Sequence, residues 1–517
     1  MKNITCIVLI VLMWGCVANK AAVLEVDTLI VGGMIVDGSG ADPRPGIIGI
    51  SGDTIVIVGD ADNISATRTI NAQGLIVSPG FIDPHTHADA DLASSKTSIN
   101  EAYLRQGVTT VFIGNDGGGG SVAVVRSALE QSGIGTNAGL WSGHGALRNA
   151  VVGETNRIAT DVELAEMKLR LGNDMKAGAL GLSTGLFYAP GSYASTDEIV
   201  SLAKVAAAYG GVYESHIRDE SNYSIGLVNA IKELIEISER AAIPAHIAHI
   251  KALGPAVHGQ SKTVIELIRS ARDQGLKITA DQYPWLASGT RLSNALIPRS
   301  VMDGGVERMR ARLRESSLVA EMRPQMLANL KRRGGASAIL ITGDSPYRGK
   351  TLKELAEEAD MDTLEKAIEI ILAGDPAIAS FMMLQDDVER LLVEPWVVTG
   401  SDGSSGHPRK YGSFPKKYQD YTVKKNLLSI SKFVRQSSAL TAEIFGLCKR
   451  GRLAIGFKAD VSIWDPDEYQ SKASYEYPTE LAMGVVHLLI NGELVIQNRK
   501  LIGIRHGKVV GPFECKT

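Results

Sequence analysis

The long centre of the chain alternates short apolar segments with helical patterns, and this alternation constrains the fold more than any other feature. Apolar runs typical of buried strands occur at residues 108–113, 180–182, 212–215, 245–250, 278–281 and 396–398. Between them, apolar residues recur at helical spacing, for example over residues 197–208, 225–241 and 261–274. Repeated strand–helix units favour a parallel (β/α)8 barrel, with a doubly wound parallel sheet as the alternative.

Both ends of the chain are predicted to be rich in β-strands. Short apolar strands separated by Gly, Asp and Pro are expected at residues 28–31, 34–36, 47–51, 55–58, 460–464, 485–490 and 493–496. The pair Asn491-Gly492 is a strong hairpin signal. We therefore expect residues 21–78 and 450–517 to form one small β-sandwich domain, and residues 79–449 to form the (β/α)8 barrel.

One segment does not fit the barrel pattern. Residues 290–345 contain a stretch, 306–333, that is dense in arginine and has helical spacing. We interpret residues 290–345 as a helical lobe that is inserted into the barrel and covers its functional site. The alternative is a long crossover between two consecutive strands.

The first 20 residues are predicted to be a signal peptide. Lys2 precedes an apolar stretch at residues 7–13, which is too short to cross a bilayer. Gly15-Cys16 follows, in the manner of a bacterial lipoprotein leader with Cys16 as the lipidated residue. Ordinary signal cleavage stays open, because Met13 and Trp14 match that site poorly. We expect an exported protein, either periplasmic or anchored to the membrane through a lipidated Cys16.

Composition excludes other classes of partner. The formal net charge is −3 and no basic stripe is present, so we expect no nucleic-acid partner. After the leader the sequence contains no run of about 20 apolar residues, so we expect no membrane-spanning segment there. Outside the leader only Cys448 and Cys515 remain, and a disulfide or two buried thiols are both compatible with the sequence.

Residues of the metal-ligand type lie at the ends of the predicted strands. His85 and His87 follow an apolar run, and on an extended backbone residues i and i+2 point to the same side, as a shared metal requires. Four more such residues each follow a separate predicted strand: Asp116, His216, His249 and Asp402. In a barrel these ends converge, so the set predicts a metal-dependent hydrolase.

Two further histidines lie near the predicted strand ends but are not assigned as ligands. His246 lies three positions before His249 and therefore faces the other side of the strand, so we assign His249 as the ligand and His246 to the core or to a supporting role. His144, between Gly143 and Gly145, is expected to line the pocket.

Taken together, these residues and their surroundings resemble the amidohydrolase superfamily, and within it the D-aminoacylase (N-acyl-D-amino-acid deacylase) family. The resemblance extends over about residues 25–510, with matching motifs at 80–89, 107–115, 143–148, 178–191, 214–220, 248–252, 281–284, 401–409 and 450–460. It implies a (β/α)8 barrel, a β-sandwich and a zinc centre.

The resemblance also implies individual roles. His216 and His249 would hold a tightly bound Zn²⁺, while His85, His87 and Asp402 would line an adjoining, weaker site. Asp402 would in addition be the catalytic acid and base. A further group would grip the substrate carboxylate, since Arg offers a bidentate fork, Lys a point charge and Tyr a hydroxyl. This group is Lys251, Tyr283 and Arg409.

One position departs from the family pattern. Where D-aminoacylases have a metal-binding cysteine, this chain has Asp116. A carboxylate can still bridge two metals, but it is a harder ligand than a thiolate. The number and identity of the metals therefore depend on Asp116.

The predicted reaction is metal-assisted hydrolysis of a linear amide. The expected substrate is a small molecule, either an N-acyl amino acid of D configuration or a dipeptide with a C-terminal D-residue. The alternatives are a cyclic-amide hydrolase of the hydantoinase or dihydroorotase kind, and an exported binding lipoprotein without catalysis. Residues 401–409 argue against the first alternative. The intact set of histidines and Asp402 argues against the second.

Overall fold

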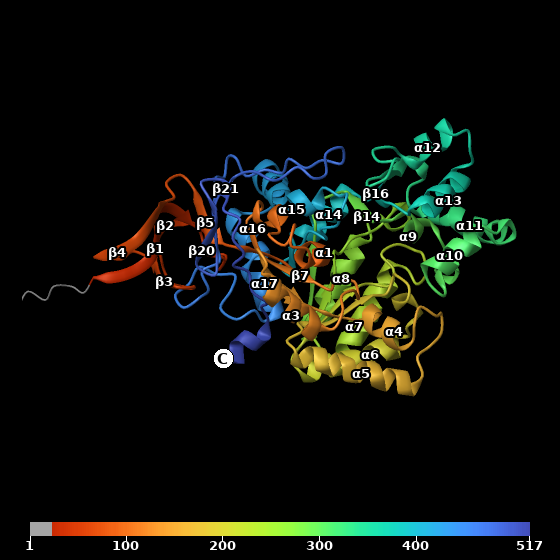
Figure 1. Ribbon diagram of the computed structural model, residues 1–517, viewed down its shortest axis with the longest axis horizontal. Helices are drawn as coiled ribbons and strands as arrows, with labels where there is room; N and C mark the ends of the chain where they lie inside the picture. Colours follow the sequence, from red (N-terminus) through yellow and green to blue (C-terminus); the bar gives the residue numbers. More distant parts are fainter. Residues whose placement is uncertain (1–22, 517) are drawn as a thin grey trace, which may run out of the picture.

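The computed structural model describes residues 23–516 and has three parts in a row (Figure 1). A β-rich domain built from both ends of the chain lies at one end, the barrel is in the middle, and a mostly helical lobe lies at the other end. The predicted leader, including Cys16, lies outside the described residues. Within them, no helix is both long and apolar enough to cross a bilayer.

The terminal domain is a single nine-stranded sheet with the order β21-β20-β19-β18-β5-β1-β2-β3, and β4 pairs with β1. Its strands are β1 (Leu24–Ile35), β2 (Arg44–Ser51), β3 (Thr54–Gly59), β4 (Ile64–Asn71), β5 (Ile76–Pro79), β18 (Val461–Trp464), β19 (Val485–Ile490), β20 (Glu493–Gln497) and β21 (Lys500–Leu501). The two ends of the chain meet where β18 runs antiparallel to β5. Isoleucine, valine and leucine side chains from both ends share one core, as in the predicted β-sandwich.

Two details of this domain can be compared with the sequence. The predicted strands at 28–31 and 34–36 are in fact one strand, β1, whose register shifts between Ile30 and Gly33. The predicted hairpin at Asn491-Gly492 is confirmed, because it joins β19 to β20 and both residues have positive φ, as the favoured two-residue turn requires.

The barrel strands are parallel and follow one another around the barrel in chain order. They are β6 (Phe81–Asp83), β7 (Val108–Ile113), β8 (Asn137–Leu140), β9 (Ser142–Gly143), β10 (Gly181–Gly185), β11 (Val212–His216), β12 (Ala245–Ile247), β13 (Ile278–Gln282) and β17 (Val397–Thr399). β8 pairs with β7 and β9 with β10, so the pair acts as one bent strand.

Closure of the barrel rules out a doubly wound sheet, in which the edge strands never meet. After β17, the amide of Asp402 donates to the carbonyl of His85 at 2.9 Å, and the amide of His87 donates to the carbonyl of Gly403 at 3.1 Å. The first and last strands are thus joined at the edge that carries the predicted ligands. The (β/α)8 barrel is confirmed.

Helices cover the outside of the barrel. They are α3 (Val122–Ser132), α5 (Asp161–Lys176), α6 (Thr196–Ala208), α7 (Leu227–Ala241), α8 (Ser261–Asp273), α14 (Gln385–Leu392), α16 (Ile430–Ser437) and α17 (Ala439–Phe445). Further helices lie in the connecting loops: α1 (Asp89–Ala93), α2 (Glu101–Leu104), α4 (His144–Val151) and α15 (Arg409–Lys417). Helix α7 shows why the pattern worked, since Leu227, Ile231 and Leu234 recur at helical spacing and are buried.

The inserted lobe is larger than predicted. It lies between β13 and β17 and comprises β14 (Ala287–Arg291), α9 (Leu292–Leu296), α10 (Val306–Leu313), α11 (Ser316–Arg332), β15 (Ile339–Ile341), α12 (Leu352–Glu358), α13 (Thr363–Ala373) and β16 (Ala377–Phe381). A small antiparallel sheet, β14-β16-β15, and a separate apolar core hold it together. The predicted end at residue 345 was wrong, because the lobe continues through α12, α13 and β16. In the sequence, α12 and α13 have the same spacing of apolar residues as the barrel helices, so they could not be told apart from them.

Cys448 and Cys515 form a disulfide, with their Cα atoms 5.2 Å apart. Of the two possibilities compatible with the sequence, the structure therefore has the cross-link. It ties the segment that follows α17 to the C-terminal end of the described chain.

Candidate metal centre

The six predicted ligands lie together at the C-terminal end of the barrel strands. His85 and His87 follow β6, Asp116 follows β7, His216 ends β11, His249 follows β12 and Asp402 follows β17. His85, His216, His249 and Asp402 are each at most 4% exposed. Their side chains come from separate strands, so the closed barrel creates the cluster.

Three of these residues have left-handed backbone conformations. The φ angles are 57° at Asp116, 33° at His249 and 48° at Asp402. Non-glycine residues adopt such angles rarely and at a cost of about 1–3 kcal/mol, and they concentrate at functional sites. Each of these three residues lies in the loop that directly follows a barrel strand: Asp116 after β7, His249 after β12 and Asp402 after β17.

Asp116 lies at the centre of the cluster. Its Oδ1 atom is 3.4 Å from His85 Nε2, 3.6 Å from His216 Nδ1 and 3.6 Å from His249 Nε2. Its Oδ2 atom is 3.6 Å from His87 Nε2. Oδ1 thus faces three histidines and Oδ2 faces His87, so this carboxylate could contribute to two neighbouring sets of ligands.

Asp402 faces the second group. Its Oδ1 atom lies 3.2 Å from His87 Nε2 and 3.9 Å from His85 Nε2. Its Oδ2 atom lies 2.7 Å from Arg409 Nη1 and 4.0 Å from His249 Nε2. Asp402 therefore contacts both the histidine cluster and one of the residues predicted to bind substrate.

The donor atoms fit a divalent metal. Three sets have all their ligand atoms within 4.8 Å of one another: His85, Asp116 and His249; His85, His87 and Asp402; and His216, Glu220 and His249. His85 Nε2, Asp116 Oδ1 and His216 Nε2 are buried and have no hydrogen-bond partner, which is unusual for buried polar atoms. Imidazole and carboxylate donors bind Zn²⁺ at about 2.0–2.2 Å, so donors separated by 3–4 Å can share one ion.

Two glutamates that the sequence analysis did not single out support the histidines. Glu214 Oε1 lies 3.0 Å from His85 Nδ1, and Glu220 Oε1 lies 3.1 Å from His249 Nδ1. A carboxylate behind a ligating histidine fixes its tautomer and orientation. In the sequence, the one indication of a role for either glutamate was its position in the 214–220 motif. Helix or strand periodicity does not reveal that a side chain will contact a histidine that follows a different strand.

Charges within the cluster set its protonation. Burial works against a charge on His85, but the carboxylates of Asp116 and Glu214 outweigh it and raise the pKa of His85 to about 10. Burial lowers the pKa of His216. At Asp402, burial is outweighed by Arg409 and His249, which hold the pKa of the carboxyl below its usual range. The carboxylates of Asp116 and Asp402 are therefore ionised, as metal ligands must be, whereas His85 has to lose a proton before it can bind a metal.

The three predicted substrate-binding residues also lie together. Lys251 Nζ is 5.6 Å and Arg409 Cζ 5.0 Å from the centre of the Tyr283 ring. All three line an inner cavity of about 20 Å³ next to His216 and Asp402. Both cations already have carboxylate partners, because Lys251 Nζ lies 2.5 Å from Glu220 Oε1 and Arg409 pairs with Asp402.

Two other histidines, His144 and His246, have structural roles. The prediction that His144 lines the pocket was wrong, since it is fully buried and its Nε2 lies 2.9 Å from Glu198, which also binds Arg148. His246 is a core residue, as one of the two predicted options had it, and it contacts Asp281 at 3.1 Å.

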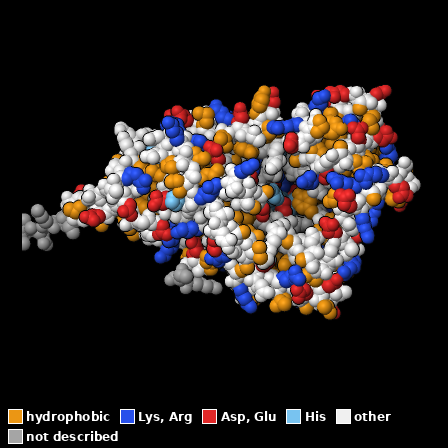
Figure 2. Space-filling model, in the orientation of Figure 1, with side chains coloured by type: hydrophobic (Ala, Val, Ile, Leu, Met, Phe, Trp, Pro, Cys, Tyr) orange, Lys and Arg blue, Asp and Glu red, His pale blue; other side chains and the backbone are white. Residues whose placement is uncertain are grey.

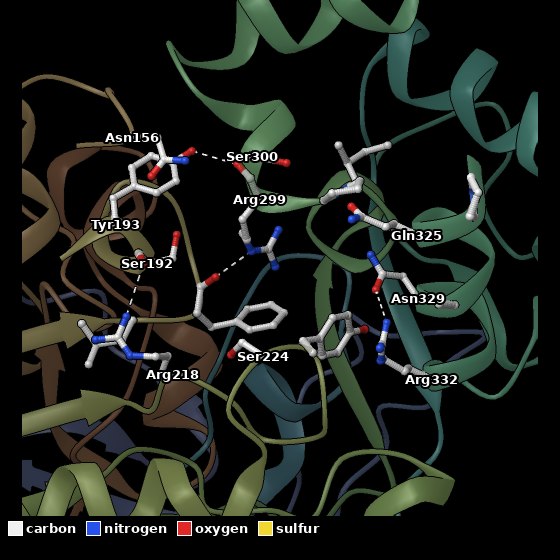
Figure 3. Close-up of a pocket in the computed structure, with 17 residues that line it drawn as sticks. Asn156, Ser192, Tyr193, Arg218, Ser224, Arg299, Ser300, Gln325, Asn329 and Arg332 are labelled. Atoms are coloured by element: carbon white, nitrogen blue, oxygen red, sulfur yellow. Dashed lines mark hydrogen bonds between the residues drawn. The ribbon is translucent and has the colours of Figure 1, made fainter. Parts of the chain in front are cut away.

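Two larger cavities lie where the lobe meets the barrel, and the surface is hollowed there (Figure 2). One, of about 620 Å³, is lined by His87, Asp116, Asp402 and Arg409 and forms the mouth of the site. The other, of about 580 Å³, is shown in Figure 3, with Arg218, Arg299 and Arg332 around it. There Arg299 Nε donates to the carbonyl of Phe187, whose ring stacks on His216 with 5.7 Å between ring centres.

Comparison with known proteins agrees with this geometry. Residues 76–495 match the amidohydrolase family. A D-aminoacylase from Alcaligenes xylosoxydans xylosoxydans is 32% identical, over 94% of this chain and 97% of that protein. A crystal structure of N-acyl-D-glutamate deacylase from Bordetella bronchiseptica, complexed with zinc and a phosphonate inhibitor, has a TM-score of 0.81 at 29% identity, over 94% of this chain and 100% of that one. A D-aminoacylase structure described as having a binuclear metal centre gives the same TM-score at 30% identity, with the same coverage of both chains. The chain belongs to the amidohydrolase family and, within it, to the D-aminoacylase group.

Proposed function

We propose that this protein hydrolyses the amide bond of N-acyl-D-amino acids, or of dipeptides with a C-terminal D-residue, to give a carboxylate and a free amino acid. The observation that carries the proposal is the position of Asp402. It contacts both the histidine cluster and Arg409. A substrate whose scissile amide lies at the histidine cluster and whose carboxylate lies at Arg409 would therefore have Asp402 within reach for proton transfer. The similar D-aminoacylase and N-acyl-D-glutamate deacylase support this substrate class.

The metal we propose is Zn²⁺. Asp116, which lies 3.6 Å from both His216 and His249, would hold a tight site with these two histidines. His85, His87 and Asp402 would hold a weaker one. The similar deacylase structure contains zinc, and the binuclear metal centre of the similar D-aminoacylase is compatible with two groups of donors here. A bound zinc ion would polarise the scissile carbonyl and lower the pKa of water toward about 7.

The chain's own residues would do the proton transfer. Asp402 would accept a proton from the attacking water and return it to the nitrogen of the leaving amine. Burial of this carboxyl is outweighed by Arg409 and His249, which hold its pKa below the usual range, so Asp402 is ionised at neutral pH. Arg409 holds Oδ2 of the same carboxylate at 2.7 Å, so Oδ1, which faces His87, is the oxygen left to receive the proton.

Substrate would be held by Lys251, Tyr283 and Arg409. These three surround the small inner cavity, and their N–H and O–H donors suit the carboxylate of the amine-side product. The two alternatives are less well supported. A hydantoin ring presents no free carboxylate for this group, and a binding protein would not need Asp402 beside the histidine cluster.

The test is a substrate panel with metal content measured on the same preparation. We expect turnover of N-acetyl-D-amino acids, little turnover of the L-enantiomers, and zinc bound to the active protein. Ring opening of hydantoins or dihydroorotate without hydrolysis of linear substrates would support the cyclic-amide alternative. Bound metal without turnover of any substrate would support the binding protein.

We also propose that the protein is exported from a bacterial cell, as a periplasmic protein or as a lipoprotein anchored through Cys16. The leader composition and the Cys448–Cys515 disulfide support this, since such bonds persist in oxidising compartments. Cell fractionation of wild type and Cys16→Ser tests it. Release of the variant from the membrane indicates lipidation. Periplasmic wild type indicates ordinary cleavage, and cytoplasmic wild type contradicts export.

A further inference from the structure

A long loop of the terminal domain reaches over the barrel toward the lobe. It joins β18 to β19 over residues 465–484, and we call it the strap. Its two arms pair with each other at Gln470 and Met483 through reciprocal backbone hydrogen bonds. Beyond this pair the strap crosses helix α15 (Figure 1), where Ser471 lies directly against Gly412 and leaves no room for a larger side chain. The strap is thus packed against the helix that carries the proposed substrate-binding arginine.

Tyr475 of the strap completes a cluster of aromatic rings next to the proposed active site. The centre of its ring lies 5.2 Å from that of His407, 5.7 Å from that of Trp285 and 4.6 Å from that of Phe381. Trp285 follows barrel strand β13, Phe381 ends lobe strand β16, and His407 precedes α15. The Tyr475 hydroxyl oxygen is buried. One side chain of the terminal domain therefore contacts the barrel, the lobe and the loop before α15.

His407 connects this cluster to the substrate-binding group. It is only 1% exposed. Its Nδ1 accepts from the backbone N–H of Arg409 at 3.1 Å, and its Nε2 lies 3.2 Å from the carbonyl of Ala287 in β14. A peptide N–H can only donate and a carbonyl can only accept, so both contacts require the neutral tautomer with the proton on Nε2. In this form the ring ties the start of α15 to a strand of the lobe.

The side chain of Arg409 is packed against the same strand. A Cβ atom added at Gly289 of β14 would lie 3.1 Å from Arg409 Nη2 and 3.2 Å from His407 Cδ2, so both side chains lie directly on the backbone. The guanidinium is held by Asp402 at 2.7 Å and lines the inner cavity. The position of Arg409 therefore depends on the His407 ring beside it. Displacements of about 1 Å at such a site are enough to weaken binding and catalysis.

We propose that Tyr475 is a positioning residue of the active site, which packs on His407, keeps its ring against β14 and thereby holds Arg409 in place for the substrate carboxylate. The terminal domain thus contributes a residue on which substrate binding in the barrel depends. The inference rests on the proposed function for the identity of the bound group, whereas the packing of Tyr475 on His407 does not.

The test uses Tyr475→Ala, which removes the ring, and Tyr475→Phe, which keeps it. Tyr477→Ala is the matched control, because Tyr477 lies two positions further along the strap and is 57% exposed. We measure kcat and KM of the metal-loaded proteins on the N-acetyl-D-amino acid that wild type hydrolyses fastest. Thermal melting verifies that each variant is folded. Tyr475→Ala is also combined with His407→Leu.

We expect the KM of Tyr475→Ala to rise about 10-fold, as when a charged hydrogen bond is weakened, with little change in kcat. Asp402 keeps its contact with His87, so proton transfer is less affected than binding. Tyr475→Phe and Tyr477→Ala should match wild type. In the His407→Leu background Tyr475→Ala should add little, because residues that act through one another are not additive.

A KM that is unchanged in Tyr475→Ala, or that rises equally in Tyr477→Ala, would overturn the inference. Additive losses in the combined variant would do the same, since Tyr475 would then act without His407.

Crystal structures of wild type and Tyr475→Ala give a readout that does not require turnover. We expect the His407 ring to leave the carbonyl of Ala287 and the Arg409 guanidinium to move away from Asp402 in the variant. If both contacts are unchanged, the inference is wrong whatever the kinetics. If Arg409 moves but wild type hydrolyses no N-acyl-D-amino acid, the proposed function fails while the role of Tyr475 in positioning Arg409 holds.

Discussion

Arg409 Nη1 lies 2.7 Å from Asp402 Oδ2, and both side chains are almost completely buried. The residue predicted to grip the substrate carboxylate is therefore also bonded to the proposed proton-transfer group. This contact holds the pKa of Asp402 low and fixes which of its oxygens faces the histidine cluster. In the proposed mechanism, substrate binding and proton transfer therefore both involve the Arg409–Asp402 ion pair.

Asp402→Asn is expected to keep the fold and bound zinc and to lose about 10³-fold or more in kcat. An amide has nearly the shape of the carboxylate and can still accept from Arg409, but it cannot take the proton from water. Metal analysis, thermal melting and steady-state kinetics on one preparation check this. A variant with near-normal kcat would show that another group transfers the proton.

Asp116→Ala is expected to release the tightly held metal, because this carboxylate lies within 3.6 Å of four imidazole nitrogens. Asp116→Cys should retain one zinc and discriminate more strongly against Mn²⁺, since a thiolate is the softer ligand. Metal content after dialysis against a chelator, followed by zinc titration with activity as the readout, measures both effects. Full metal retention in Asp116→Ala would contradict the central role of this residue.

Glu220→Gln is expected to weaken metal binding about 10–100-fold. The substitution removes the acceptor charge that orients His249 and pairs with Lys251, at 3.1 and 2.5 Å. Competition with a chelator of known affinity gives the metal Kd. Glu236→Gln, at an exposed position of α7, is the control and should match wild type. If the two variants have the same Kd, Glu220 does not support the metal centre.

Lys417→Met is expected to stabilise the protein, and to do so most at low pH. Burial lowers the pKa of Lys417 from 10.5 to about 7, so the unfolded chain binds a proton that the folded chain does not between these values. The resulting cost to the free energy of unfolding is fully present below about pH 7 and disappears as the pH rises toward 10.5.

The stabilisation should therefore be a few kcal/mol near pH 6 and about a third of that near pH 9.5. Chemical unfolding at both pH values measures it. Lys416→Met is the control, because Lys416 is 29% exposed and pairs with Asp420. A stabilisation that is the same at both pH values would mean that Lys417 is not buried as a neutral amine.

The sequence predicted the parts of this protein that depend on local periodicity. Alternating strands and helices indicated the barrel, and the C-terminal ends of parallel strands converge, so His85, His216 and Asp402 could be placed together without a structure. The hairpin at Asn491-Gly492 was equally local, since it depends only on two residues that tolerate positive φ.

Only the tertiary structure decided the relationships between segments far apart in the chain. It closed the lobe at β16 rather than at residue 345, joined Cys448 to Cys515, and placed Glu220 behind His249. Contacts of this kind depend on how separate elements pack against one another. Spacing along the chain reports which face of a helix or strand is apolar, and carries no information about which distant side chain will lie opposite it.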